Sequence, residues 1–103
     1  MAIYGPAQYR DLVDSVRTAA ASLTPGALTA NVVNTSNTIT VPGAAVGDIV
    51  EMVAPASLGA IIMSGEVTAA NTVTVKFLSN AVTAPATGVY VAICKRLTGL
   101  ALV

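Results

Sequence analysis

Apolar and polar side chains alternate with a period of two through much of this chain, and this pattern constrains the fold more than any other feature. The alternation is clearest over residues 71–77, Asn-Thr-Val-Thr-Val-Lys-Phe. Because successive side chains of a β-strand point to opposite faces, this segment predicts a strand with its two valines and its phenylalanine on one face. Residues 37–41 and 88–95 alternate in the same way and predict two more strands.

Weaker apolar runs over residues 28–33, 48–54 and 60–69 predict three further strands. Turn-forming Gly, Pro, Asn and Ser residues separate these runs. Six short strands with closely spaced turns are typical of an antiparallel β-sandwich or a jelly-roll-like domain. The chain of 103 residues has the length of one domain. We therefore predict an all-β domain over residues 27–103.

The N-terminal region follows a different period. Its apolar residues are spaced i, i+3, i+4 and i+7, as on one face of a helix: Tyr9, Leu12, Val13 and Val16. Pro6 suits the first helical position, and the Thr-Pro-Gly sequence at 24–26 would end the helix. We therefore predict an N-terminal arm with a short helix over residues 1–26. A helix of about 15 residues is marginal alone in water, so its stripe should pack on the β domain or on a neighbouring subunit.

The chain carries few charges for its size. Only 10% of residues are charged, compared with about 25% in typical soluble domains. Hydrophobic residues make up 54%, with an excess of Ala and Val. Either Thr, Ser, Asn and Ala cover the surface, or a large area is buried against other copies of the chain. The second interpretation is favoured because large exposed apolar patches usually mark interaction sites.

Two of the predicted strands are apolar on both faces. In residues 48–54, Val50 and Met52 share one face, and the opposite face carries two more apolar residues with Glu51. In residues 88–95, Val89, Val91 and Ile93 share one face, and Tyr90, Ala92 and Cys94 share the other. A free-standing antiparallel sandwich usually has a polar outer face, so either another part of the chain covers these positions or they form a subunit interface. The C-terminal residues 97–103 are also apolar for a free end. The predicted partner-binding residues are Tyr9, Leu12, Val13, Val16, Val50, Met52, Tyr90, Leu100 and Leu102.

The residue types that most catalytic and metal sites need are scarce here. The chain has no His and a single cysteine, Cys94, which is more simply a packing residue than a nucleophile. No spacing links the carboxylates Asp48, Glu51 and Glu66 as an acid pair. We therefore predict a protein that is not an enzyme and has no cofactor, metal or small-molecule substrate.

The same sequence argues against two classes of partner and favours one compartment. The five basic residues are scattered, which predicts no nucleic-acid binding. No apolar run reaches the roughly 20 residues of a membrane-spanning helix. The first residues lack the pattern of a secretory signal, and a single cysteine fits a reducing cytoplasm.

Three segments together carry a family resemblance. They are TITVPGAAVGDIV at 38–50, GEVTAANTVTVKF at 65–77 and GVYVAICK at 88–95. This order, with an intervening loop rich in small and polar residues, resembles a small β module of tailed-bacteriophage structural proteins. The resemblance covers roughly residues 37–96 and does not extend to residues 1–26.

The resemblance implies a virion protein. Modules of this kind occur in capsid decoration (cement) proteins and in the tips or heads of fibres, commonly as trimers. We therefore expect a homotrimer that binds the major capsid protein on the outer shell, assembled in the host cytoplasm and located on the capsid surface of the virion. A fibre-tip or receptor-binding module is the alternative.

Overall fold

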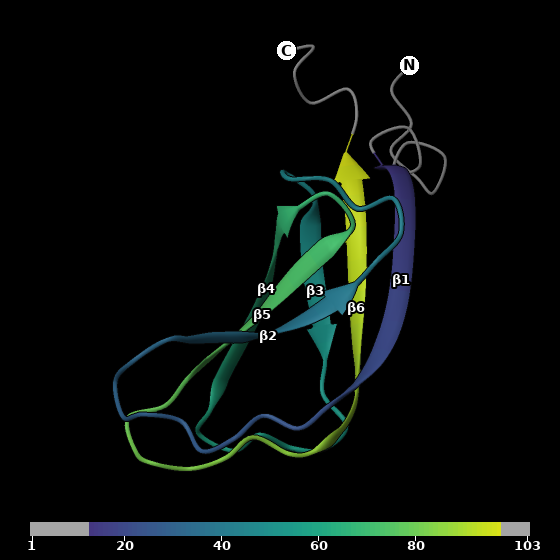
Figure 1. Ribbon diagram of the computed structural model, residues 1–103. Coiled ribbons are helices and arrows are strands. Elements are labelled where there is room, and N and C mark those ends of the chain that lie inside the picture. The colour runs from purple at the N-terminus through teal and green to yellow at the C-terminus, as the bar shows by residue number, and fades with distance from the viewer. Residues whose placement is uncertain (1–12, 98–103) are drawn as a thin grey trace, which may run out of the picture.

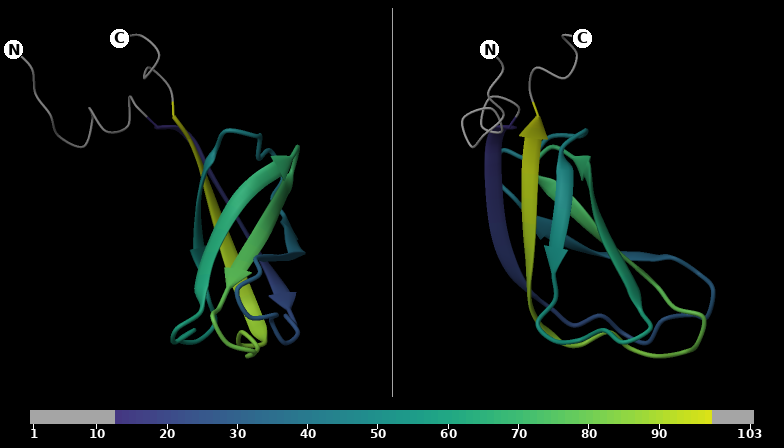
Figure 2. Two further views of the ribbon diagram at one scale, coloured as in Figure 1. Left: turned by 90° about the vertical axis from the view of Figure 1, so that its left-hand side faces the viewer. Right: turned by 180° about the vertical axis from the view of Figure 1, so that it is seen from behind.

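The computed structural model describes residues 13–97 of the chain, with six β-strands and no helix among them. The strands are β1 (Val13–Leu23), β2 (Asn34–Thr40), β3 (Ile49–Val53), β4 (Ile62–Ala69), β5 (Thr72–Leu78) and β6 (Gly88–Leu97). They form two three-stranded sheets in the orders β1-β6-β3 and β2-β5-β4, and every pairing is antiparallel. The two sheets face each other as layers of a sandwich (Figure 1; Figure 2). The predicted antiparallel all-β sandwich is confirmed.

The core lies between the two layers and is built from alternate residues of the central strands. On β5, Val73, Val75 and Phe77 are fully buried, as the alternation predicts. On β6, the buried residues include Tyr90, whose ring meets the ring of Phe77 edge-on at a centroid distance of 5.8 Å. Aromatic pairs prefer this T-shaped arrangement. The contact therefore joins the centres of the two sheets.

The predicted N-terminal helix is wrong over residues 13–23, because these residues form β1. From Ser15 to Leu23 the strand pairs with β6 without a break in register. The backbone bonds to a distant strand outweigh the weak helical spacing, because local propensity is a weak prior that tertiary pairing often overrides. The predicted division at residue 26, between an N-terminal arm and the β domain, therefore places β1 in the arm, although β1 belongs to the sandwich. Residues 1–12, where the rest of the predicted helix falls, lie outside the described residues.

The predicted strand over residues 28–33 is also wrong, since this segment is a loop with a turn at its centre. Leu28 is buried, and its backbone N–H donates to the Thr83 carbonyl at 2.7 Å. Asn31 has a φ of 63° and donates its N–H to the Ser79 carbonyl. Six strands were predicted and six are observed, but only because β1, which was not predicted as a strand, takes the place of residues 28–33 in the count.

Candidate assembly surface

The outer face of the β1-β6-β3 sheet carries mainly apolar side chains, and we call it the apolar face. The cross-strand register sets its residues in rows: Val16, Lys95 and Ile49; then Thr18, Ile93 and Glu51; then Ala20, Val91 and Val53; and last Ser22 and Val89. The most exposed large side chains of this face are Val16, Ile49, Val53 and Val89, at 48–54%. Figure 2, in its right-hand view, looks onto this sheet from outside.

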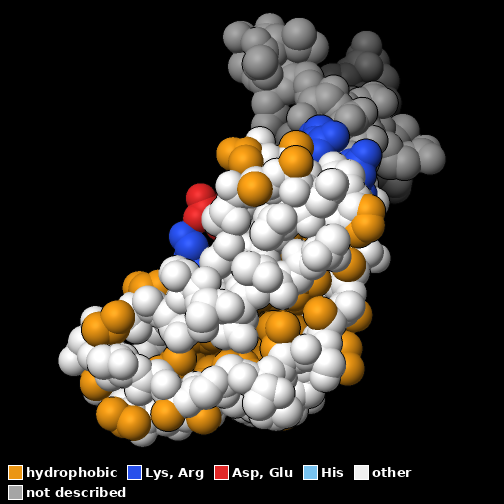
Figure 3. Space-filling view, viewed as in Figure 1, with side chains coloured by type: hydrophobic (Ala, Val, Ile, Leu, Met, Phe, Trp, Pro, Cys, Tyr) orange, Lys and Arg blue, Asp and Glu red, His pale blue; other side chains and the backbone are white. Residues whose placement is uncertain are grey.

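The outer face of the β2-β5-β4 sheet is mostly polar, and its apolar exceptions are Ile62, which is 65% exposed, and the half-buried Leu78. Its exposed or half-buried residues include Thr38, Thr40, Thr72, Ser64, Glu66, Thr68 and Lys76. Thr68 and Thr74 share a hydrogen bond of 2.8 Å between their hydroxyls, and Lys76 pairs with Glu66. Figure 3 looks onto this side, where polar side chains and backbone cover much of the surface and hydrophobic side chains show at the upper end, along the right-hand edge and across the lower part.

The contrast between the two outer faces has a physical meaning. A solvated sheet face in an antiparallel sandwich normally carries polar residues. The β2-β5-β4 face follows this rule except at Ile62, whereas the β1-β6-β3 face of the same chain departs from it with a Val or Ile in every row. The apolar face is therefore the surface of the described residues best suited to contact another protein.

One ion pair crosses the apolar face. Lys95 of β6 pairs with Glu51 of β3, and their side chains are 29% and 55% exposed. Pairs exposed in this way contribute about 0–1 kcal/mol. Contact energy from this face would therefore come mainly from its Val and Ile side chains.

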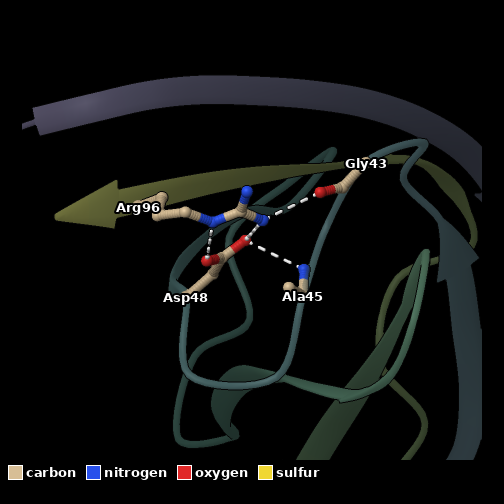
Figure 4. A network of polar contacts seen from close by, with 4 residues as sticks. All are labelled: Gly43, Ala45, Asp48 and Arg96. Carbon is tan, nitrogen blue, oxygen red and sulfur yellow. Dashed lines mark hydrogen bonds and ion pairs between the residues drawn. The ribbon is translucent and has the colours of Figure 1, made fainter. Parts of the chain in front are cut away.

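A buried carboxylate holds the loop before β3 against the end of β6 (Figure 4). Arg96 donates to both oxygens of Asp48, at 3.0 and 3.1 Å, and to the Gly43 carbonyl at 2.9 Å. The Ala45 N–H also donates to Asp48, at 3.0 Å. The Asp48 side chain is only 4% exposed, and the hydrogen bond from Arg96 lowers the pKa of this carboxyl. This network fixes the start of β3 beside β6 and so aligns the rows of the apolar face.

The backbone conformation at position 43 favours glycine. Its φ of 87° lies in the left-handed region, which side chains disfavour. A Cβ at this position would also collide with the Arg17 side chain from β1. A side chain here would therefore be strained by its backbone conformation, and the flexible end of the Arg17 side chain would have to move.

The structure separates the predicted partner-binding residues into three groups. Val16 lies on the apolar face and is 54% exposed. Val50 and Met52 are half-buried against the core, and Tyr90 is fully buried with its hydroxyl donating to the Ala86 carbonyl at 2.6 Å. Val13 begins β1, but its side chain is not described. Tyr9, Leu12, Leu100 and Leu102 lie outside the described residues.

On β3 and β6 the exposed apolar residues are thus on the faces opposite to the predicted ones. Ile49 and Val53 flank Glu51 on the outside of β3, and Val89, Val91 and Ile93 precede Lys95 on the outside of β6. Glu51 and Lys95 could have indicated the exposed faces from the sequence, because a Glu or Lys is almost never fully buried. Each marks the solvent side of a strand that is apolar on both faces.

Other groups in the described residues offer little for chemistry. Cys94 is 1% exposed, and burial raises the pKa of its thiol, which disfavours the reactive thiolate. No group of three or more His, Cys, Asp or Glu side chains in residues 13–97 could hold a metal ion. Nor does this part of the chain contain a helix that is long and apolar enough to cross a membrane.

Comparisons with known protein families, with curated proteins and with solved structures found no match for this chain.

Proposed function

We propose that this protein is a non-enzymatic structural subunit whose apolar face is covered by another protein surface in an assembly. The observation that supports this proposal is the contrast between the outer faces of the two sheets. One sandwich that carries both a polar and an apolar outer face is suited to have water on one side and a protein on the other.

The size of the apolar face indicates how such an assembly is stabilised. Complete burial of a Val or Ile side chain contributes about 1.5–3 kcal/mol. Four half-exposed side chains therefore add roughly 3–6 kcal/mol per subunit, which is comparable with the cost of about 4–15 kcal/mol for immobilising one free molecule. A single copy would bind weakly through this face, whereas several linked copies would bind much more tightly.

In its more specific form, we propose a capsid decoration protein that binds the major capsid protein on the outer shell as a homotrimer. The resemblance over residues 37–96 supports this form, as does the need for several linked contacts. The apolar face would meet the shell, and the polar face would point to solvent on the capsid surface of the virion. The protein would be assembled in the host cytoplasm.

A binding experiment with capsid shells that lack this protein tests the proposal. Purified wild-type protein should restore saturable density on the shells, in multiples of three copies per site. Val53→Glu places a charge on the apolar face, and we expect it to weaken binding at least tenfold because burying an unpaired charge is costly. Thr40→Glu is the matched control on the polar face and should bind like the wild type. Equal binding by the two variants, or no binding of the wild type, would contradict the proposal.

A fibre-tip or receptor-binding module is the alternative, and one feature favours it. An open cleft of about 330 Å³ lies at the loop end of the β2-β5-β4 sheet. Its lining combines polar and apolar groups: Asn31, Ala60, Ile62, Leu78, Ser79 and Asn80. Binding to host cells that Asn80→Ala abolishes, without affinity for shells, would favour this alternative.

A further inference from the structure

The two sheets have four edge strands, and β1 differs from the other three. β3 has only five residues. The pairing of β2 with β5 shifts between Asn34 and Asn37, and that of β4 with β5 shifts between Val67 and Ala69. Short strands and irregular pairing are features that prevent a sheet edge from pairing with another strand. Each of these three edges therefore offers a shorter stretch of regular pairing than residues 15–23 of β1.

β1 lacks these protective features over most of its length. It has eleven residues, and its only irregularity lies at its start, between Val13 and Ser15. Residues 16–23 contain no Pro and one charge, Arg17, whose side chain packs against the loop at Gly43. No strand of the described residues lies beyond β1 in its sheet, and β1 forms one side of the sandwich in Figure 1 and Figure 2. Among the described residues, no strand pairs with the outward N–H and C=O groups of β1.

We propose that β1 pairs with β1 of a second copy of this chain, antiparallel and about a twofold axis near Ala19. The two three-stranded sheets would join into one sheet of six strands in the order β3-β6-β1-β1-β6-β3. This goes beyond the proposed function, because the contact lies at a sheet edge and not on the apolar face. With the proposed homotrimer, each twofold contact would join a copy of one trimer to a copy of another.

A second copy suits this edge better than an unrelated strand. A twofold contact needs only one long and regular edge, since the same surface serves both partners, and β1 is the longest such edge among the described strands. With the axis at Ala19, Arg17 lies opposite Ala21 of the second copy, so no like charges face each other. Pairing would also extend the apolar face, because Val16 would lie opposite Ser22 of the second copy and Thr18 opposite Ala20, all on the same outer side.

Adjacent proline substitutions on β1 test the proposal. Successive N–H groups of a strand point to opposite sides, so one of Ala19→Pro and Ala20→Pro removes a bond to β6 and the other removes an outward N–H. Proline is tolerated on an edge strand when the missing N–H faces solvent. We expect one variant to keep the wild-type circular dichroism and cooperative melt and to have half of the native mass by light scattering. The other variant serves as the control for loss of the β1–β6 ladder.

Wild-type native mass in the folded proline variant would overturn the proposal. Val53→Glu, which impairs only the apolar face, should keep the wild-type native mass in solution, so failure of shell binding and failure of the β1 contact are distinguishable. If both proline variants unfold, amide hydrogen exchange of the wild-type protein decides. Protection of alternate β1 amides should fall on dilution while that of β5 amides stays constant. Protection of β1 that does not depend on concentration would contradict the proposal.

Discussion

At the scale of single residues, Asp48 joins segments that are far apart in the sequence. Its carboxylate receives hydrogen bonds from Arg96 at the end of β6 and from Ala45 in the loop before β3. Because the side chain is nearly inaccessible to water, loss of this carboxylate would leave donors unsatisfied. The loop carries three more features of tight packing: Gly43 with positive φ, the buried Val41 and the buried Ala44.

We expect Asp48→Asn to destabilise the fold by about 1–3 kcal/mol at neutral pH, because hydrogen bonds to a charged group are lost. The pKa of Asp48 is lower in the folded protein than the ordinary value of 3.8. Its stabilising contribution is therefore complete above this value and is lost as the pH falls through the folded pKa. Urea unfolding across the acid range should show the wild type and the variant converging below about pH 4.

Glu66→Gln is the control for this prediction. Glu66 also forms an ion pair, with Lys76, but its side chain is 58% exposed. Its removal should change the free energy of unfolding by no more than about 1 kcal/mol. An equal effect of the two substitutions would mean that the buried Asp48 network has no special role.

At the scale of elements, β1 decides how the β1-β6-β3 sheet is completed. It covers one side of β6 along nearly the full length of that strand, and Ala19 and Ala21 pack against the core. Without β1, the inner and edge surfaces of β6, including the buried Cys94, would meet water. β1 is therefore part of the sandwich and not an appended arm.

Deletion of residues 1–24 should abolish cooperative unfolding, because it removes one of the three strands of this sheet. Deletion of residues 1–12 is the matched control, and we expect it to retain a cooperative melt, since all six described strands remain. Circular dichroism during thermal unfolding measures both. A cooperative, β-rich transition in the longer deletion would show that β6 and β3 form a stable layer without β1.

At the scale of the whole molecule, low charge is the property that shapes association. The formal net charge is zero, with five basic and five acidic residues. Three ion pairs in the described region use three of the acidic residues, Asp48, Glu51 and Glu66. Long-range electrostatic attraction therefore contributes little, and contact with a partner should depend on apolar burial.

Association of this protein, with itself or with shells, should be insensitive to salt. Raising NaCl from about 0.05 to about 0.5 M shortens the screening length from roughly 14 to roughly 4 Å. We expect the dissociation constant to change less than about twofold over this range, and sulfate to strengthen binding. Titration by light scattering at each salt concentration measures the effect. Weakening by tenfold or more with NaCl would point to charge pairs as the main contact.

The period of two in segments such as residues 71–77 was sufficient to predict an all-β sandwich and the buried face of β5. This succeeds because alternation is a local property that survives in any antiparallel arrangement with one buried side. The same reasoning failed for β1, whose run of Ala and Ser residues contains no strong alternation, so that spacing alone favoured a helix.

The assembly surface could not be assigned from the sequence, because the sequence did not indicate which face of β3 and β6 packs against the core. β3 and β6 are apolar on both faces, and either face could have met the core. The tertiary structure decided it, because Tyr90, Ala92 and Cys94 pack with Phe77 from the opposite sheet and turn Val89, Val91 and Ile93 outward. The class of fold, the low charge and the excess of apolar residues could therefore be predicted from the amino-acid sequence. The apolar residues that stay exposed and the edge strand that remains open could not, because both depend on how strands from distant parts of the chain pack together.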